Sequence, residues 1–421
     1  MKKVFSIIIA AALLASLSAS AFASEPGFGN FTYSHHYSAG QFRDVRGSDW
    51  FSRYVEDAYN FGFLRGKSET MFDPGGLLTL GEAVTLAARL RSIYFTGKAD
   101  FTQSVPYYAV YAEYALHHGI IDAPDNYNAP VSRARFAVLM RSALPPDAFP
   151  VLNAIPDFGI CDVASDTDVG AAVYVLYRAG ILSGSDRFGT FFPDSNISRA
   201  EACAVMVRLA DPLMRVRTLL PDSIPAEIIF QRSSDAVFML ETFDSSGDSI
   251  RTGSGFFISD SGLAVTALHV FNFAASATLT LHSGETYNVS GVLATSDEYN
   301  LAIFSVDSTG GGFRYLQLAD SDIIEVGNTV YALGSPRGLH NTISDGIVSF
   351  SSREVAYDTL IQFSAPISFG SGGGPLLNTL GQVVGVATSS FTAGQNLNLA
   401  VPVNFIKTIE HGPLVRLSDL P

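Results

Sequence analysis

The chain has 421 residues, of which 47% are hydrophobic and 16% charged, and it carries a formal net charge of −14 at pH 7. That length exceeds what one hydrophobic core usually organises, so the sequence predicts two or three folded domains. The acidic balance excludes nucleic acid as an expected partner, because phosphate binding requires clustered Lys and Arg.

The first 23 residues have the pattern of a secretory signal peptide. Lys2 and Lys3 precede an apolar stretch from Val4 to Leu17, and Ala21-Phe22-Ala23 has the small-x-small form of a cleavage site. The apolar stretch is short for a membrane span, and no later segment is long and apolar enough to provide one. We therefore expect an exported chain with no membrane span after signal cleavage.

The region from Phe42 to Leu209 repeats one order of motifs at intervals of about 60 residues, which is the signature of a repeat architecture. Each copy has an initial turn, a helical pattern that ends at glycine, and a second helix that opens at Thr or Ser. The first copy contains Phe42-Arg43-Asp44-Val45, Gly62-Phe63-Leu64-Arg65-Gly66 and Thr79; the third contains Ile160-Cys161-Asp162-Val163, Gly180-Ile181-Leu182-Ser183-Gly184 and Ser198; the middle copy keeps Gly119-Ile120-Ile121 and Ser132.

These units resemble the S-layer-homology family, whose copies begin with Phe-x-Asp, turn at Gly-Ile-x-x-Gly and open a helix with Thr-Arg-Ala-Glu. The resemblance implies an all-α unit of three repeats that binds anionic, often pyruvylated, cell-wall polysaccharide. By position, Arg133 and Arg199 would meet the ligand carboxylate, and Asp162 and Gly184 would shape the third groove. Leu80 stands where the first copy would have its arginine.

The helix openings also have a structural interpretation. Thr79 with Glu82, and Ser198 with Glu201, have the spacing of a capping box, in which hydroxyl and carboxylate satisfy free N–H groups at the helix start. Such a cap is compatible with ligand binding. It does not require the arginine, whose planar fork suits a sugar carboxylate.

The two cysteines, Cys161 and Cys203, both fall in the third repeat. An oxidising exterior would allow them to form a disulfide or to remain free, and the sequence leaves both states open. Two cysteines without a histidine cluster do not make a metal site, so we expect no metal and no cofactor.

From Ala236 onward, short apolar or alternating runs separated by Gly, Ser, Asn and Asp predict an all-β domain. Four motifs in order resemble the HtrA (DegP-type) serine proteases: Gly253–Ile258, Val265–Val270, Leu333–Gly338 leading into Ser344–Ser349, and Gly373–Asn378, followed by the Ala400–Asn404 strand. The resemblance implies a chymotrypsin-like double β-barrel with its catalytic residues in the cleft between the barrels. The chain stops about 17 residues after that strand, so we expect no PDZ module.

The predicted organisation is therefore multidomain. It comprises a signal peptide over residues 1–23, a flexible spacer over 24–41, repeats over 42–98, 99–153 and 154–212, a linker over 213–225, a trypsin-like serine-protease-fold domain over 226–412 and a tail over 413–421.

The catalytic motifs of this domain are altered at two of three positions. The resemblance places His269 at the general base, Asn300 at the position of the aspartate and Gly372 at the position of the nucleophilic serine. Ser371 lies one residue early, and in a tight turn that slip points its hydroxyl away from the base unless the glycine-rich loop rearranges. The N–H groups of Gly370 and Gly372 could still form the oxyanion hole, which needs no side chains.

Three functions remain open from the sequence. The first is a cell-wall-anchored pseudoprotease of the cell surface whose cleft binds peptide or protein segments without cutting them. The second is an active serine endopeptidase that uses Ser371 with His269. The third is a purely structural S-layer or surface protein.

Overall fold

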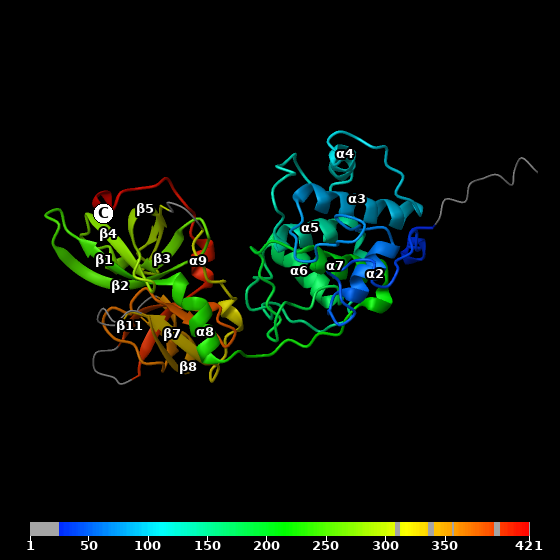
Figure 1. The fold of residues 1–421 in the computed structure, drawn as a ribbon. Coiled ribbons are helices and arrows are strands. Elements are labelled where there is room, and N and C mark those ends of the chain that lie inside the picture. Colours follow the sequence, from blue (N-terminus) through cyan, green and yellow to red (C-terminus); the bar gives the residue numbers. More distant parts are fainter. Residues whose placement is uncertain (1–24, 308–311, 336–340, 356–357, 391–395, 421) are drawn as a thin grey trace, which may run out of the picture. The chain divides into compact units, whose positions relative to one another are not determined.

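The computed structural model describes residues 25–307, 312–335, 341–355, 358–390 and 396–420. The predicted signal peptide lies outside these ranges, as do Pro336, Arg337 and Gly338 of the third protease motif. The chain divides into two compact units (Figure 1): one holds Met1–Asn153, Val175–Leu182 and Pro193–Thr218, and the other holds Ala154–Tyr174, Ser183–Phe192 and Leu219–Pro421. In the described part of the chain, no helix has the length and apolar character needed to cross a membrane.

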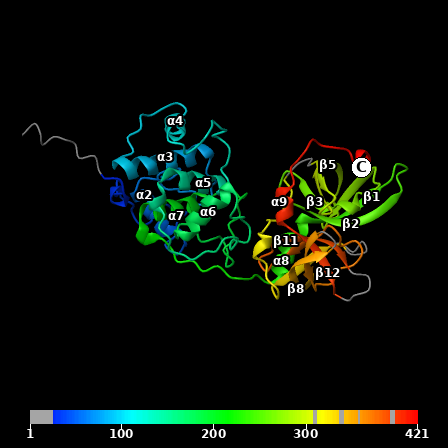
Figure 2. The same ribbon diagram turned by 180° about the vertical axis from the view of Figure 1, so that it is seen from behind.

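The N-terminal region contains helices joined by turns. In the first unit α3 packs against α4 and α5, and α2 packs against α7 (Figure 2). The helices are α2 (Ser52–Asn60), α3 (Leu80–Thr96), α4 (Ala109–His117), α5 (Arg133–Ala143), α6 (Asp168–Arg178) and α7 (Arg199–Ala210).

The two predicted capping boxes are confirmed. Thr79 accepts a hydrogen bond from the N–H of Glu82, whose carboxylate accepts from the N–H of Thr79, and Ser198 and Glu201 make the same reciprocal pair. Ser132 caps α5 through the N–H of Arg135, where no glutamate is present to return the bond. The worn middle copy therefore keeps the hydroxyl half of the cap.

A ring of backbone hydrogen bonds joins the three copies just before these helices. The N–H of Leu78 donates to the carbonyl of Ile197 (3.1 Å), Ile197 donates to Val131 (3.1 Å) and Val131 donates back to Leu78 (2.9 Å). All three side chains are buried, with exposed fractions of 1–3%. The three copies thus take equivalent places in this ring, including the middle one that the sequence shows only faintly.

Residues 25–41, where the composition predicts a spacer, are hydrogen-bonded to this unit. The N–H of Gly27 and the amide of Asn30 both donate to the carbonyl of Tyr94 in α3. Tyr33 donates to Asp57 of α2 at 2.8 Å, which raises the pKa of Tyr33 to about 12. This segment, which shows no helical or strand periodicity in its sequence, therefore has hydrogen-bonding partners in the repeat unit.

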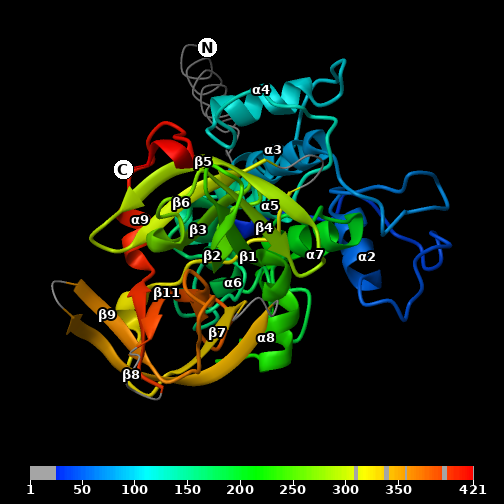
Figure 3. The ribbon, with the colours of Figure 1, turned by 90° about the vertical axis from the view of Figure 1, so that its left-hand side faces the viewer.

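The C-terminal half folds into two closed six-stranded barrels, which confirms the predicted chymotrypsin-like double β-barrel. The strand orders are β1-β2-β3-β6-β5-β4 and β10-β11-β12-β9-β8-β7 (Figure 3). The strands are β1 (Val237–Phe243), β2 (Ser249–Phe257), β3 (Leu263–Ala267), β4 (Ser276–Leu281), β5 (Thr286–Ser296), β6 (Leu301–Val306), β7 (Thr329–Gly334), β8 (Thr342–Val355), β9 (Asp358–Phe363), β10 (Pro375–Leu377), β11 (Val383–Ser390) and β12 (Asn398–Pro402); the short helices α8 (Ala226–Ser233) and α9 (Asn404–Thr408) flank them in sequence.

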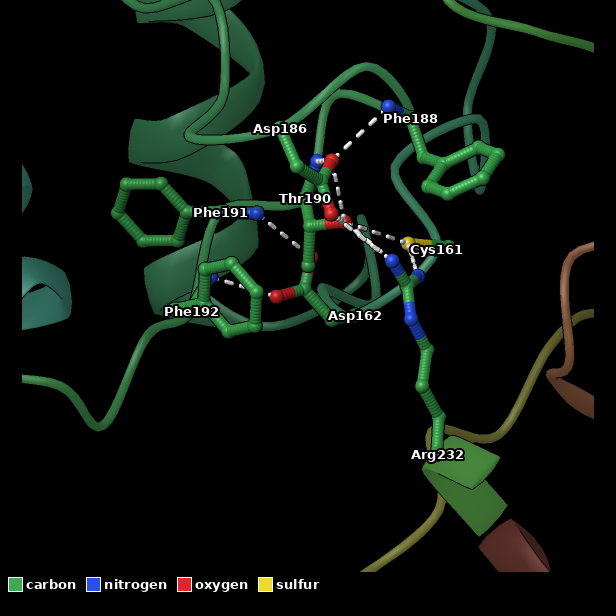
Figure 4. A network of polar contacts seen from close by, with 8 residues as sticks. All are labelled: Cys161, Asp162, Asp186, Phe188, Thr190, Phe191, Phe192 and Arg232. Atoms are coloured by element: carbon green, nitrogen blue, oxygen red, sulfur yellow. Dashed lines mark hydrogen bonds and ion pairs between the residues drawn. The ribbon is translucent and has the colours of Figure 1, made fainter. Parts of the chain in front are cut away.

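Two segments of the third repeat pack against the barrels within the second unit. Helix α8 supplies Arg232, whose guanidinium donates to Asp186 (2.9 Å), Thr190 (3.0 Å) and the sulfur of Cys161 (3.2 Å) (Figure 4). Fully buried Gln382 donates to the carbonyls of Phe158 (3.1 Å) and Ile160 (3.0 Å). These polar contacts attach the turns of the third repeat to the protease-like fold.

We predict that Gln382→Met lowers the free energy of unfolding by about 2 to 4 kcal/mol, because two carbonyls lose their donor in a buried setting. The matched control is Lys407→Met, which breaks the partly exposed ion pair with Asp166 (2.7 Å) and should cost less than about 1 kcal/mol. Thermal and urea unfolding of the full chain measure both. Equal effects of the two substitutions would show that the Gln382 contacts contribute no more than a surface pair.

Candidate functional site

The imidazole of His269 is placed by the turn that follows β3. Strand β3 pairs with β6 up to Ala267 and Leu301, and a 3-10 turn over Leu268–Val270 then carries His269. The carbonyl of Asn300 accepts from the N–H of Leu268 (2.9 Å), and its side-chain Oδ1 accepts from the N–H of His269 (2.9 Å). Asn300 therefore fixes both the backbone and the side chain of the base.

The Asn300 amide faces Nδ1 of His269 with both of its groups. Nδ1 lies 2.9 Å from Nδ2 and 3.3 Å from Oδ1, while Oδ1 also accepts from the N–H of His269 (2.9 Å) and Nδ2 donates to Thr388 Oγ1 (2.8 Å). An amide, unlike a carboxylate, can donate to Nδ1, and a neutral ring whose Nδ1 accepts carries its proton on Nε2. A general base needs the opposite tautomer, with its lone pair on Nε2.

The pKa of His269 lies below its ordinary value. Burial of the half-buried ring disfavours the imidazolium most strongly, and the positive charge of Arg251 lowers the pKa further, while the contact with Asn300 acts in the opposite direction. A serine protease instead stabilises the imidazolium with a carboxylate. Burial and the charge of Arg251 therefore favour the neutral ring at this site.

Gly372 occupies the place from which a nucleophile would reach His269. A Cβ on Gly372 would lie 3.3 Å from His269 Nε2, 3.4 Å from Cε1 and 3.8 Å from the carbonyl of Thr388. Its φ lies outside the left-handed region that favours glycine, whereas Gly370 and Gly373 have φ of 91° and 86°. The backbone at 372 is thus compatible with serine, and the missing hydroxyl is a matter of the side chain alone.

Ser371 and His269 are not brought together. Ser371 is buried at 6% exposure, and its Oγ accepts a hydrogen bond from the N–H of Ser368 at 3.4 Å. Among the described residues the imidazole has side-chain hydrogen bonds to Asn300 and none to Ser371. Ser371 instead lines a cavity beside the loop.

The loop that carries the predicted oxyanion hole is held by Ser254 of β2. Ser254 donates through Oγ to the carbonyl of Gly370 (2.7 Å) and through its N–H to the carbonyl of Gly372 (2.8 Å), while Oγ accepts from the N–H of Ser335 (2.8 Å). Within the described part of the chain, the N–H groups of Gly370 and Gly372 have no acceptor. Sequence reasoning missed this role of Ser254, although it lies inside the Gly-Ser-Gly-Phe motif.

A cavity of about 150 Å³ lies beside this loop, bounded by β7, β8, β10, β11 and the segment before Gly370. A volume of this size is large enough for a molecule such as benzene. Among the described residues, none of the lining side chains is charged; they belong to Ala332, Leu333, Thr342, Ser344, Pro366, Ile367, Ser368, Ser371, Pro375 and Ala387. The cavity therefore suits a small uncharged side chain of a bound peptide.

The two arginines expected at the wall-polymer site are both buried and engaged inside the repeats. Arg133, at 8% exposure, forms an ion pair with Glu201, and Arg199, at 5% exposure, donates to the carbonyls of Phe72 and Arg65. The guanidinium of Arg199 also stacks over the Phe72 ring, 4.7 Å from its centre. Both arginines thus join neighbouring repeats.

Asp162 and Gly184 form the turns of the third repeat. The Asp162 carboxylate accepts from the N–H groups of Phe191 (3.0 Å) and Phe192 (2.6 Å) (Figure 4). Asp44 accepts in the same way from the corresponding turn of the first repeat. Burial raises the pKa of Asp162, and these bonds oppose the rise. Gly184 has φ of 82°, and a Cβ there would lie 2.5 Å from the backbone of Gly189.

Both cysteines are free and buried. Burial raises the pKa of Cys161 to about 11 and that of Cys203 to about 12, so neither thiol ionises near neutral pH. The described residues contain no cluster of three His, Cys, Asp or Glu side chains that could hold a metal ion.

Comparison with known families agrees with this geometry. A family described as the trypsin-like peptidase domain matches residues 253–386, and the S-layer homology domain matches residues 41–84 and 162–203. The chain carries S-layer homology segments and a trypsin-like peptidase domain. Together they support an HtrA-like protein associated with the cell surface.

Curated relatives match the peptidase region. The putative serine protease HhoA of Synechocystis is 33% identical over 166 residues, covering 38% of this chain and 42% of the relative. Probable DegP-like periplasmic serine endoproteases of Rhizobium meliloti and Bartonella henselae are 33% and 36% identical, each over 37% of this chain and covering 32% and 31% of their own lengths. The chain thus spans less than half the length of these relatives. A solved HtrA-type protease, an AlgW variant with a tripeptide, is 26% identical and covers 44% of this chain and 62% of its own, with a TM-score of 0.41.

We predict that Asn300→Asp raises the pKa of His269 by about 1 unit or more, because a carboxylate beside Nδ1 stabilises the imidazolium. In the parent chain the ring should titrate below its ordinary range, since burial and Arg251 disfavour its charge. NMR of the Cε1–H resonance against pH measures both. Asn272→Asp, three residues beyond His269, adds the same charge and should shift the pKa less; an unchanged pKa in Asn300→Asp would contradict the assigned geometry.

Proposed function

We propose that this chain is an exported, wall-anchored pseudoprotease whose cleft binds peptide segments without hydrolysing them. One observation carries the proposal: the position 3.3 Å from His269 Nε2 belongs to Gly372, which has no nucleophilic atom. The second altered position acts in the same direction, because Asn300 presents to Nδ1 an uncharged amide, which can donate to it, in place of a carboxylate. A cleft of this kind retains the scaffold for peptide binding and lacks the group that attacks a carbonyl.

The alternative of an active protease through Ser371 has little geometric support. Its Oγ accepts from Ser368 and lines the cavity, and its position in the loop is fixed by the Ser371 N–H bond to the carbonyl of Ser368 (2.9 Å). Reaching His269 would require the loop to give up its two bonds to Ser254. A purely structural role is disfavoured by the cavity and by the N–H groups of Gly370 and Gly372, for which the described residues provide no acceptor and which a spacer would not need.

Wall attachment is supported by the S-layer homology matches. We assign Arg133 and Arg199 to building the junctions between repeats, because each guanidinium already binds groups of a neighbouring repeat. We assign Asp162 and Gly184 to shaping the third groove, because they lie in the turns of the third repeat. The polysaccharide contact would then come from the surfaces that these junctions hold in place.

We expect the mature chain to be retained on isolated cell walls and released when anionic polymers are extracted from the walls. Arg199→Ala should abolish retention together with a fall in melting temperature, because a buried stacked guanidinium is lost. Arg43→Ala is the control, since that arginine is exposed. Loss of retention in Arg199→Ala with unchanged melting would contradict the junction role and restore a direct ligand contact.

Restoring both catalytic side chains should restore hydrolysis. Gly372→Ser with Asn300→Asp places a hydroxyl beside Nε2 and a carboxylate at Nδ1, and the 3.3 Å spacing requires only a small adjustment of the ring. Gly372→Ser alone should hydrolyse peptides about 10⁴-fold more slowly than the double variant, because an amide at position 300 favours the wrong tautomer of His269. Casein hydrolysis and labelling by a fluorophosphonate measure the result. The parent chain should do neither, and labelling of Ser371 in the parent would overturn the proposal.

A further inference from the structure

A second cavity, of about 590 Å³, lies at one end of the first barrel. Strands β1 and β5 end there and β4 begins there, since Asp244, Thr295 and Ala275 all line it. The described residues of its lining belong to this barrel or to the tail that follows α9, and none of them belongs to the second barrel. The cavity is therefore distinct from the one beside the Gly370 loop, with which it shares no lining residue.

The tail supplies one wall of this barrel-end cavity, and the C-terminus lies beside the barrel (Figure 1). The N–H of Val292 in β5 donates to the carbonyl of Val415 (2.8 Å), and the N–H of Val415 donates back to Val292 (2.8 Å). A Cβ on Gly291 would lie 2.8 Å from the Val415 carbonyl, so glycine gives the tail room to pair with the strand. Leu417, at 5% exposure, and Leu420 then pack against the barrel core and line the cavity.

The floor of the barrel-end cavity is apolar. Leu268, Phe271 and Ala274 lie in or against the core of the first barrel, and the exposed fractions of Phe271 and Ala274 are 2% and 4%. Together with Leu417 and Leu420 they form a surface on which methylene groups can pack. The floor therefore favours a ligand with an apolar stem.

The sides of the cavity are acidic. Asp244 and Asp297 both line it. The carboxylate of Asp244 accepts from the Oγ (2.7 Å) and the N–H (2.9 Å) of Ser246, and these bonds hold its pKa below the ordinary value. None of the described lining residues is basic, and Arg416, which precedes Leu417, is exposed and lies outside the lining. The cavity therefore selects a cation.

Phe273 lines the same cavity in a backbone conformation that is unfavourable for phenylalanine. The N–H of Ala274 donates to the carbonyl of Phe271 (3.0 Å), so Phe273 takes the third position of a tight turn, where its φ is 66° and glycine is usual. Such a φ is an outlier for a bulky residue, and outliers of this kind cluster at functional sites. The side chain is 89% exposed, so packing in the fold does not account for it.

We propose that the barrel-end cavity binds an arginine side chain of a partner polypeptide, with the guanidinium at Asp244, Asp297 and the ring of Phe273 and the methylene groups on the apolar floor. A guanidinium can pair with carboxylates and stack on an aromatic face, which a compact ammonium does less well. A volume of about 590 Å³ is that of a ligand pocket and also admits residues that flank the arginine. This contact lies outside the cleft and does not depend on the function proposed for it.

Two pools of fluorescein-labelled hexapeptides test the proposal by fluorescence anisotropy with the full chain. One pool has arginine at its third position, the other has citrulline, and the remaining positions are random but exclude Lys and Arg. Citrulline keeps the shape of arginine and removes its charge. We expect the arginine pool to bind about tenfold or more tightly, because the charge-assisted bonds to the carboxylates are lost with citrulline.

Variants of the lining separate ligand contact from folding. Asp297→Asn and Phe273→Gly should each lower the affinity for the arginine pool about tenfold. Phe273→Gly should also keep or raise the melting temperature, because glycine adopts a φ of 66° without strain. The matched control is Glu298→Gln, which removes the neighbouring exposed charge from outside the lining and should change the affinity less than about twofold.

Each contrary outcome overturns a definite part of the proposal. Equal binding of the arginine and citrulline pools, or of neither, would exclude an arginine site. Equal losses in Asp297→Asn and Glu298→Gln would show that only the general negative charge of the surface attracts the peptides. Displacement of the arginine pool by an equal concentration of spermidine would assign the cavity to small polycations instead of a polypeptide. None of these results alters the test of the cleft, which depends on Gly372 and Asn300.

Discussion

The contact between the Asn300 amide and His269 limits what the cleft can do. Nδ2 lies 2.9 Å and Oδ1 3.3 Å from Nδ1 of the ring, so the imidazole faces an uncharged amide. In a serine protease a carboxylate stands at this point, fixes the imidazole tautomer and stabilises the imidazolium that forms during attack. The alterations at 300 and 372 are therefore consistent with each other: one removes this support of the base, and the other removes the nucleophile that the base would activate.

The surrounding scaffold is retained in detail. Ser254 binds the carbonyls of Gly370 and Gly372 and so ties the loop to the first barrel. Gly373 has a left-handed φ, and a Cβ there would lie 2.3 Å from the Ser254 carbonyl oxygen, so both the backbone and the available space require glycine. Such a loop keeps its donors oriented whether or not a serine follows. Recognition and bond cleavage are separable in this fold, because recognition depends on backbone groups and a cavity, whereas cleavage depends on three side chains.

The sequence predicts the parts of the protein that depend on local motifs. The capping boxes at Thr79 and Ser198 could be predicted from residue types and spacing, whereas the double barrel and the relation of Gly372 to His269 were implied by the resemblance of the motifs to the HtrA proteases. The structure adds contacts between distant residues: the bonds of Ser254 to the loop, the pairing of Arg133 with Glu201, and the attachment of Arg232 to Asp186 (Figure 4). These join segments more than 40 positions apart, which periodicity cannot reveal.

The arginines show why motif position alone is an incomplete guide to binding. A planar guanidinium suits a sugar carboxylate and also suits backbone carbonyls and an aromatic ring, and burial decides between these uses. Arg199 has 5% of its surface exposed and its donors face Phe72 and Arg65, so its chemistry is directed inward. The same residue type in the same motif can thus organise a surface without touching the ligand.

The fate of a bound peptide tests the central claim most directly. The full chain is incubated for a long period with a peptide pool, the complex is isolated, and the bound material and the protein are analysed by intact-mass spectrometry. If the cleft binds peptides but has no nucleophile, the peptides are recovered at full length and the mass of the protein is unchanged. Recovery of fragments, or a protein carrying an acyl group on Ser371, would contradict the account.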